Sequence, residues 1–300
     1  MMLHAGSALA PHDLWRAWSV EPAVILPMAV TAALYARGAI NASRRSPHGL
    51  QRQHRAAVAF GAGWLVLAIA LVSPLHQLGG VLFSAHMAQH ELLIIIAAPL
   101  LVLSRPVVPF LWSIPMNARR VVGGVFAREP VRSIWSVISL PAVATVLHGA
   151  AIWAWHAPPL YDASVRSELV HTAQHATFLG TALVFWWAII FGRGRRAGHG
   201  MSVILVFLTA VHTTVLGALL AVSETSWYSA YTLSGTGPWG LTTVEDQQLG
   251  GLLMWVPATI GYLVAALALF ASWMRESELR VLSREKVTGS TLASGPIALR

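Results

Sequence analysis

The sequence predicts an all-α membrane protein, a polytopic helix bundle with seven transmembrane helices. Hydrophobic residues make up 56% of the 300 residues and charged residues only 11%, whereas an ordinary soluble domain carries roughly 25% charged residues. Several apolar runs approach the length of about 20 residues that crosses a bilayer. Cysteine is absent, which excludes disulfides, thiolate metal sites and cysteine nucleophiles.

Seven segments have the length and apolar character of spans. They cover residues 22–37, 56–73, 85–103, 133–155, 169–191, 201–222 and 247–273. Pro22 and Pro27 predict a kink in the first segment, because proline interrupts the helical hydrogen-bond ladder. We expect residues 1–275 to form a single transmembrane domain and residues 276–300 to form a polar cytoplasmic tail that frays into disorder.

Positive charge predicts the orientation of these spans. Of the 20 Lys and Arg residues, 18 fall in the first, third and fifth connections and in the C-terminal tail, and only Arg16 and Arg166 fall on the other side. Basic connections stay cytoplasmic during insertion, so we expect the N-terminus outside and the C-terminus inside. The formal charge of +8 then reflects topology and contact with anionic membrane lipids, and no nucleic-acid motif accompanies it.

Two nearly identical pentapeptides open two of the spans. HMAQH opens the third span and HTAQH opens the fifth, and the topology places both at the outer face. Residues four apart share one face of a helix, so each motif can point two imidazoles inward, one about 6 Å below the other. We expect two layers, with His86 beside His171 above and His90 beside His175 below.

Further polar residues lie at similar depth. His148 in the fourth span and Asp246 at the mouth of the seventh are expected to complete a metal-ligand set with the four motif histidines, because polar groups in lipid are costly and commonly mark function. Additional candidate ligands are His156, His212, Met87, Met254 and Glu91. Gln89 and Gln174 occupy equivalent places in the two motifs and are expected to hydrogen-bond the ligand rings.

A histidine cluster without thiolates suits copper, zinc, iron or nickel. The predicted site faces outward, where copper is handled, and the thioethers of Met87 and Met254 would favour monovalent copper. Core or lipid-facing packing is the alternative role for both methionines. Copper is therefore the expected metal, with zinc and haem iron as weaker alternatives.

Three sequence blocks follow one another in this order: SAHMAQHELLIIIAAPLLVLSRP, WAWHAPPLYDASVRSELVHTAQHATFLGTALVFWW and DQQLGGLLMWVP. Together they resemble the CtaG-type cytochrome c oxidase assembly factors, which are multi-pass bacterial membrane proteins, over roughly residues 60–275. The resemblance implies a place in the bacterial inner (plasma) membrane and a role in supplying or inserting copper into a haem–copper oxidase. The family's polar blocks match His86, His90, His148, His156, His171, His175 and Asp246. Glu91 departs from the pattern, where an apolar residue is expected.

The leading hypothesis is a copper-binding assembly factor, not an enzyme, that receives copper from a periplasmic carrier and passes it to oxidase subunits. One alternative is a copper or proton transporter or channel that uses the histidines and Glu91 as a relay, although no polar ladder continues into the inner half of the spans. A second alternative is an intramembrane zinc hydrolase with Asp246 as base, although the sequence has no HExxH motif.

Overall fold

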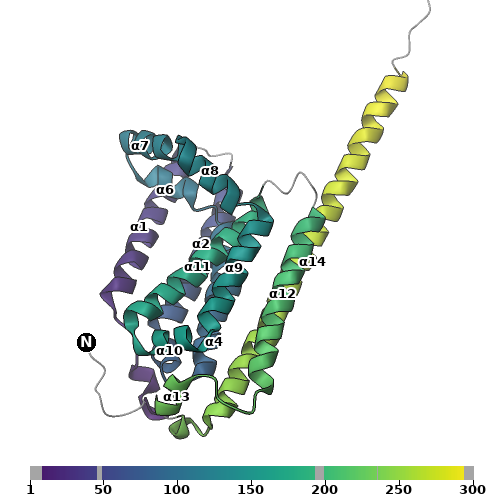
Figure 1. The fold of residues 1–300 in the computed structure, drawn as a ribbon. Coiled ribbons are helices and arrows are strands. Elements are labelled where there is room, and N and C mark those ends of the chain that lie inside the picture. Colours follow the sequence, from purple (N-terminus) through teal and green to yellow (C-terminus); the bar gives the residue numbers. More distant parts are fainter. Residues whose placement is uncertain (1–8, 46–48, 193–198, 235, 294–300) are drawn as a thin grey trace, which may run out of the picture.

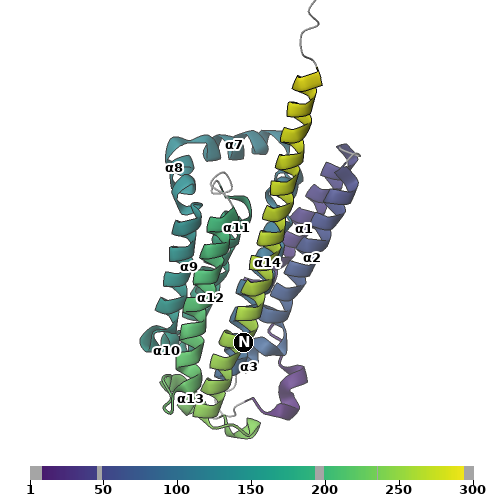
Figure 2. The ribbon, with the colours of Figure 1, turned by 90° about the vertical axis from the view of Figure 1, so that its right-hand side faces the viewer.

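The computed structural model describes residues 9–45, 49–192, 199–234 and 236–293, and every regular element within them is a helix (Figure 1 and Figure 2). The all-α prediction is therefore confirmed. Arg193, Arg195 and Arg196 of the fifth connection and residues 294–300 of the predicted tail lie outside the described residues.

Within the described residues, six helical segments are long and apolar enough to cross a membrane. They are α1 (Pro22–Arg45), α2 (Leu50–Val72), the run of α4 (Phe83–Glu91), η3 (Leu92–Ala97) and α5 (Ala98–Leu103), α11 (Glu168–Phe191), α12 (His199–Val222) and α14 (Thr243–Ala293). The shorter elements are η1 (Pro11–Arg16), α3 (Pro74–Gly79), α6 (Val107–Ser113), α7 (Met116–Ala127), α8 (Glu129–Ile138), α9 (Pro141–His156), α10 (Pro158–Arg166), α13 (Ser229–Ser234) and η5 (Gly237–Trp239). The chain is thus a multi-pass membrane protein.

The predicted span over 133–155 is wrong as a single straight helix. Helix α8 ends at Ile138, α9 begins at Pro141, and the two are bent by 75°. Pro141 has no N–H, and Leu140 before it is extended, as the steric demands of proline favour. The 16 residues of α9 rise only about 24 Å, less than the hydrocarbon core of about 30 Å. A seventh span exists only if this bent pair counts as one.

The seventh predicted span agrees with the structure, in which the apolar part of α14 that could cross a membrane covers Thr243–Arg275. Helix α14 continues past residue 273 and ends at Ala293, so the described part of the predicted tail is helical rather than frayed. Its sequence RESELRVLSREKV is rich in leucine, arginine, lysine and glutamate, which are strong helix formers. Figure 1 shows this extension projecting well beyond the other helices.

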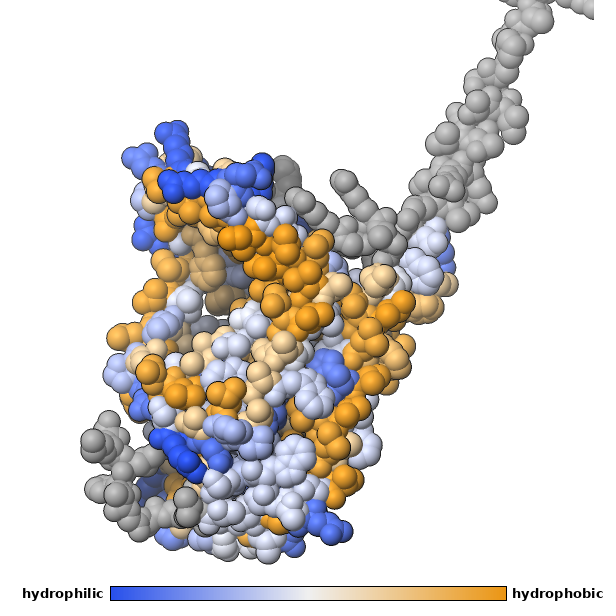
Figure 3. All heavy atoms as spheres, in the orientation of Figure 1, coloured by the Kyte–Doolittle hydropathy of each residue, from blue (hydrophilic) through white to orange (hydrophobic). Residues whose placement is uncertain are grey.

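The bundle has two ends, which we name after helices that lie there. The α13 end holds α3, α10 and α13, and the α7 end holds α7 and α8 (Figure 1 and Figure 2). Between them, α12 packs along α14, α9 packs on α11, and α4 packs on α14. Figure 3 shows apolar residues over the middle of the visible face and hydrophilic residues toward both ends, the distribution expected of a membrane bundle.

The third span contains a π-helical segment, η3, directly after the HMAQH motif. In a π-helix each carbonyl accepts from the residue five positions ahead, but Pro99 has no N–H to offer Ile94. The indole Nε1–H of Trp186 donates to the Ile94 carbonyl instead, at 2.8 Å. Because Trp186 belongs to α11, this hydrogen bond fixes the third span against the fifth.

Replacing Trp186 with phenylalanine should therefore destabilise the protein. The change leaves a buried carbonyl without a partner, which costs about 1–3 kcal/mol, and thermal unfolding in detergent would report the loss. Trp187→Phe is the matched control, since Trp187 makes ring contacts with Trp135 and Phe191. Equal shifts in Tm for the two variants would contradict the assigned role of the Ile94 carbonyl.

Candidate metal centre

The two pentapeptide motifs meet in space. The two spans that carry them are neighbours, because η3 and α5 of the third span both pack on α11. Across the helices, ring centroids are 4.9 Å apart for His86 and His171 and 5.3 Å apart for His90 and His175. Within each motif the centroids are 4.4 Å and 4.2 Å apart. The structure thus forms the two predicted histidine pairs.

Three of these rings have the geometry of a metal site. Ligand nitrogens of His86, His171 and His175 lie within 4.8 Å of one another. Nitrogens held about 2.0–2.1 Å from a metal ion are at most roughly 4.2 Å apart, so small side-chain rotations would close the set. His90 lies against the same group, one helical turn beyond His86 on α4, and is also buried, at 3% exposure.

The cluster has unused lone pairs. Among the described residues, both ring nitrogens of His90 and the Nε2 atoms of His156, His171 and His175 are buried without a hydrogen-bond partner. A buried polar atom without a partner costs about 1–3 kcal/mol. Neutral imidazoles coordinate copper and zinc through such lone pairs, so the donor set fits a metal ion of this class.

The proton of His86 can be assigned from its neighbours. Its Nδ1 lies 3.0 Å from the Tyr231 hydroxyl, which itself donates to the Gly79 carbonyl at 2.9 Å. Because that hydroxyl has a single proton, His86 Nδ1–H must donate to the Tyr231 oxygen. Nε2 therefore carries the lone pair, and burial raises the pKa of Tyr231 above its ordinary value, which keeps the hydroxyl protonated.

Gln174 contacts the other nitrogen of His86, as predicted. Its Oε1 is 3.2 Å from His86 Nε2, while its amide nitrogen has no partner among the described residues. Oxygen facing a lone pair is unfavourable, and a half-turn of the amide would place an N–H donor on Nε2. A metal ion that takes the Nε2 lone pair would displace this contact and leave Tyr231 to orient the ring.

His156 lies beside the cluster at the C-terminal end of α9. Its Nδ1 is 2.7 Å from the Ile152 carbonyl, and a carbonyl only accepts, so the proton is on Nδ1 and the lone pair on Nε2. The ring centroid is 6.1 Å from that of His90. His156 is thus placed as a further ligand for an ion that sits deep in the cluster.

His76 is a cluster residue that sequence reasoning missed. It lies on α3, and its ring stacks on His171 with a centroid distance of 5.2 Å. Gln89 donates from its amide nitrogen to His76 Nδ1 at 3.1 Å, so Gln89 serves this ring rather than a ring of the predicted set. Burial lowers the pKa of His76, against the opposing effect of Glu21, which favours the neutral imidazole.

Asp246 is not placed as a ligand of the cluster. Its carboxylate accepts from the backbone N–H groups of Phe83 and Ser84, at 2.6 Å and 3.1 Å, and from the Ser84 hydroxyl at 2.5 Å. The first N–H groups of a helix lack intrahelical partners and carry a partial positive charge. Asp246 therefore caps α4, the helix that carries His86 and His90.

The rest of the DQQLGG block packs helices closely. A Cβ on Gly250 would lie 2.3 Å from the Phe83 ring, and one on Gly251 would lie 2.6 Å from the Gly217 carbonyl oxygen. Gln247 accepts from the Trp227 backbone N–H at 2.7 Å. The block thus seats α14 against α4 and α12 and holds the loop that leads to α13.

His148 and His212 also lie apart from the cluster, contrary to the prediction that His148 completes its ligand set. The His148 ring stacks on Phe185, with centroids 5.4 Å apart, and its Nδ1 is 3.0 Å from the Thr181 hydroxyl. His212 Nε2 lies 3.3 Å from where a Cβ on Gly149 would be. These two residues form a separate pair between α9 and α12.

Of the remaining candidate ligands, the two methionines are buried in the core and Glu91 is half-buried. Met87 and Met254 belong to the apolar core, at 0% and 4% exposure, in line with the packing role considered for them. Glu91 has a buried Oε2 without a partner among the described residues. It follows the cluster in α4, at the start of η3.

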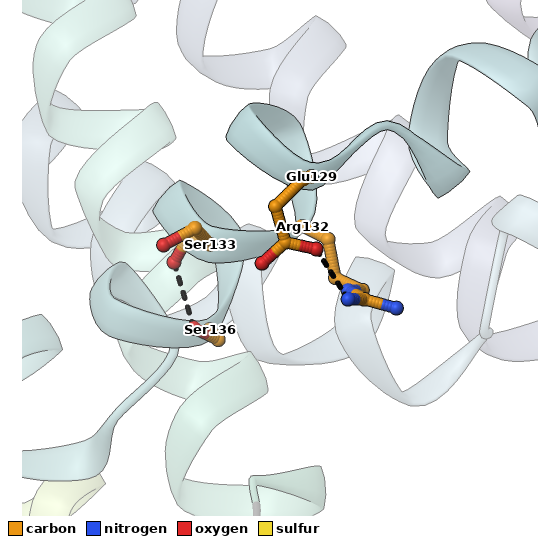
Figure 4. A pocket seen from close by; sticks show the side chains of 4 residues that line it. All are labelled: Glu129, Arg132, Ser133 and Ser136. Atoms are coloured by element: carbon orange, nitrogen blue, oxygen red, sulfur yellow. Dashed lines mark hydrogen bonds and ion pairs between the residues drawn. The ribbon is translucent and has the colours of Figure 1, made fainter.

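A surface pocket on α8 has no relation to these histidines. It has a volume of about 340 Å³ and is lined by Glu129, Arg132, Ser133 and Ser136. Figure 4 shows that Glu129 and Arg132 pair with each other and that Ser136 hydrogen-bonds to Ser133. The pocket therefore holds an exposed ion pair and two serines, and none of the candidate ligands lines it.

Comparisons with known proteins identify the family. A family model described as the cytochrome c oxidase caa3 assembly factor (Caa3_CtaG) matches residues 33–276. The curated "Uncharacterized protein Mb0105" of Mycobacterium bovis is 31% identical over 234 residues, which are 74% of this chain and 35% of that protein. "Uncharacterized protein ML1998" of Mycobacterium leprae is 26% identical over 244 residues, 77% and 36% of the two chains.

The chain spans about a third of the length of the curated relatives it matches, and no solved structure matches it. The family match begins in α1, ends where the apolar part of α14 ends, and includes both histidine motifs and the DQQLGG block. It confirms the resemblance that the three sequence blocks indicate. This chain belongs to the cytochrome c oxidase caa3 assembly factor family.

Proposed function

We propose that this chain binds copper at the histidine cluster and passes it to a haem–copper oxidase during assembly in the bacterial inner membrane. The observation that carries the proposal is the set of buried lone-pair nitrogens where α4 meets α11. Imidazoles without thiolates suit copper, and the family's role in oxidase assembly supplies a recipient for it. The protein acts as a carrier rather than as an enzyme.

The orientation predicted from the basic residues is part of this proposal. Arg45 at the end of α1 and Arg119 of α7 both lie over the Trp112 ring, 5.2 Å and 4.3 Å from its centroid, so basic residues of two connections gather at the α7 end. Positive charge favours the cytoplasmic side. The α13 end, with the histidine cluster, would then face the periplasm and a copper carrier there.

Exposure across the cluster supports an inward path for the ion. His76 and His171 are half-buried, whereas His86 and His90 are 1% and 3% exposed. Copper would meet the outer pair first and move to the inner rings. Release to an oxidase subunit would follow from exchange onto that subunit's own ligands.

The zinc hydrolase alternative has no support from the site. The base it requires, Asp246, accepts three hydrogen bonds from the start of α4, one of them from the Ser84 hydroxyl. A transporter would need a series of polar groups that continues from the cluster toward the α7 end. Glu91, which directly follows His90, would be the first member of such a series.

The direct test of the function is the oxidase activity of a deletion strain, measured with and without added copper. We expect low activity that wild-type protein restores and that His90→Ala with His175→Ala does not restore. His54→Ala, which changes an exposed histidine of α2, is the matched control and should restore activity fully. Normal oxidase activity and copper content in the deletion strain would refute the proposal.

Tyr231→Phe should weaken copper binding without removing a ligand. The change deletes the oxygen that accepts from His86 Nδ1–H, and the loss of a partner that orients a ligand lowers metal affinity about 10–100-fold. Competition with a copper chelator measures this shift. Tyr228→Phe is the control, since the Tyr228 hydroxyl donates to the His156 carbonyl and not to a ligand ring; equal losses in both variants would argue against the assignment.

A further inference from the structure

His148 holds a buried lone pair that nothing in the cluster uses. The Thr181 hydroxyl donates to the Thr177 carbonyl at 2.8 Å, so the His148 Nδ1–H donates to the Thr181 oxygen at 3.0 Å. The lone pair is then on Nε2, which has no partner among the described residues. His148 is 0% exposed, so bulk solvent does not reach this nitrogen.

His212 faces this region from α12, which packs on α9. Both of its ring nitrogens are buried without a hydrogen-bond partner among the described residues. Its ring occupies the space over Gly149, where a Cβ would lie 3.3 Å from Nε2 and 3.5 Å from Cε1. The His212 ring therefore packs directly over the glycine that follows His148 in α9, which brings a second imidazole to this part of the α9–α12 contact.

This pair lies deeper in the membrane than the cluster. The contacts of His148 on α11 are Thr181 and Phe185, six and ten residues beyond His175. At about 1.5 Å per residue this places the pair roughly 9–15 Å farther along the helix. The two sites are therefore distinct, with the deeper one between α9 and α12.

We propose that His148 and His212 form a second cation site, which binds monovalent copper between two imidazole nitrogens. In the described part of the chain neither ring has a hydrogen bond or ion pair to a carboxylate. Without such a counter-charge, a singly charged ion is favoured over a divalent one, because the solvation free energy lost on burial rises with the square of the charge. Monovalent copper also accepts two nitrogen ligands, whereas zinc requires about four.

The second site would hold the same copper ion after it leaves the histidine cluster. This role rests on the proposed function. His212 is half-buried on α12, beside Val211 and Val215, which are 42% and 46% exposed. These neighbours face the surroundings of the bundle at the depth of the apolar belt. An ion held by His212 could therefore leave sideways, toward a transmembrane helix of an oxidase subunit.

The test is the stoichiometry and coordination of monovalent copper on the purified full-length protein in detergent, with ascorbate present. We expect two ions per chain in the wild type and one in His148→Ala and in His212→Ala, with loss of the X-ray absorption-edge feature of two-coordinate copper. Gly149→Val should give the same loss, since its side chain would displace the His212 ring without removing a ligand. His54→Ala should retain two ions.

The outcomes separate this proposal from the proposed function. If His148→Ala does not fold, His212→Ala and Gly149→Val decide, because the half-buried ring of His212 makes no hydrogen bond that folding would lose. Two ions retained in those variants, or one ion in the wild type, would overturn the second site. Loss of copper from His90→Ala with His175→Ala reports on the cluster alone, so either site can fail without the other.

Discussion

Replacing His90 and His175 together with alanine is expected to lower the affinity of the histidine cluster for copper by more than 100-fold. Their rings are 5.3 Å apart, and both have buried nitrogens without a partner among the described residues. Loss of a residue that only orients a ligand lowers affinity about 10–100-fold, so loss of two ligands should exceed that range. Chelator competition on purified protein measures the change.

The control for this experiment is a histidine change that leaves the cluster intact. His54→Ala removes an exposed imidazole near the α7 end of α2 and should leave copper affinity within twofold of the wild type. Without copper, the Tm of the double variant should equal or exceed that of His54→Ala, since the double change removes unpaired buried nitrogens. Unchanged copper affinity in the double variant would refute the metal centre itself.

The pairing of the two motifs could be predicted from sequence because it depends on two simple regularities. Helical periodicity places His86 with His90 on one face, and the arginine distribution places both motifs at one end of the bundle. No long-range detail is needed for either step. The further assumption, that the third and fifth spans are neighbours, is confirmed by the contacts of η3 and α5 with α11.

The contributions of other residues depend on tertiary contacts that have no local sequence signal. His76 reaches His171 because α3 folds back onto α4, and neither residue's neighbours in sequence encode that approach. An estimate of depth suggested His148 for the cluster, but its contacts on α11 lie six and ten residues beyond His175, so its ring is farther from the α13 end than the cluster is. Its ring points toward Phe185 and Thr181 instead.

The bent fourth span and the π-helix had partial signals in the sequence. Pro141 is compatible with the first position of a new helix. It is equally compatible with a continuous apolar span, so the sequence alone does not locate the break between α8 and α9. Pro99 removes one donor from the third span, but the choice of a π-helical register over a kink depends on Trp186, 87 positions later, reaching the Ile94 carbonyl. Hydropathy does not report such a contact.

Replacing Asp246 with alanine should strongly destabilise the bundle. The carboxylate accepts three hydrogen bonds at the start of α4, and hydrogen bonds to a charged group contribute about 1.5–3 kcal/mol each. Because these contributions overlap, we expect a total loss of about 3–5 kcal/mol, seen as a lower Tm. Ser84→Ala removes one of the three bonds and should lose about a third as much.

The same variants distinguish a cap from a ligand. A bound ion stabilises the folded state by an amount set by its affinity, so copper should raise the Tm of Asp246→Asn by nearly as much as it raises that of the wild type if Asp246 only caps α4. In His90→Ala with His175→Ala, copper should give almost no shift. If Asp246→Asn instead lost the copper-induced shift while Ser84→Ala kept full stability, Asp246 would be a ligand and the cap assignment would be wrong. The cap predicts the reverse because the Asp246 oxygens face the first N–H groups of α4, at 2.6 Å from Phe83 and 3.1 Å from Ser84.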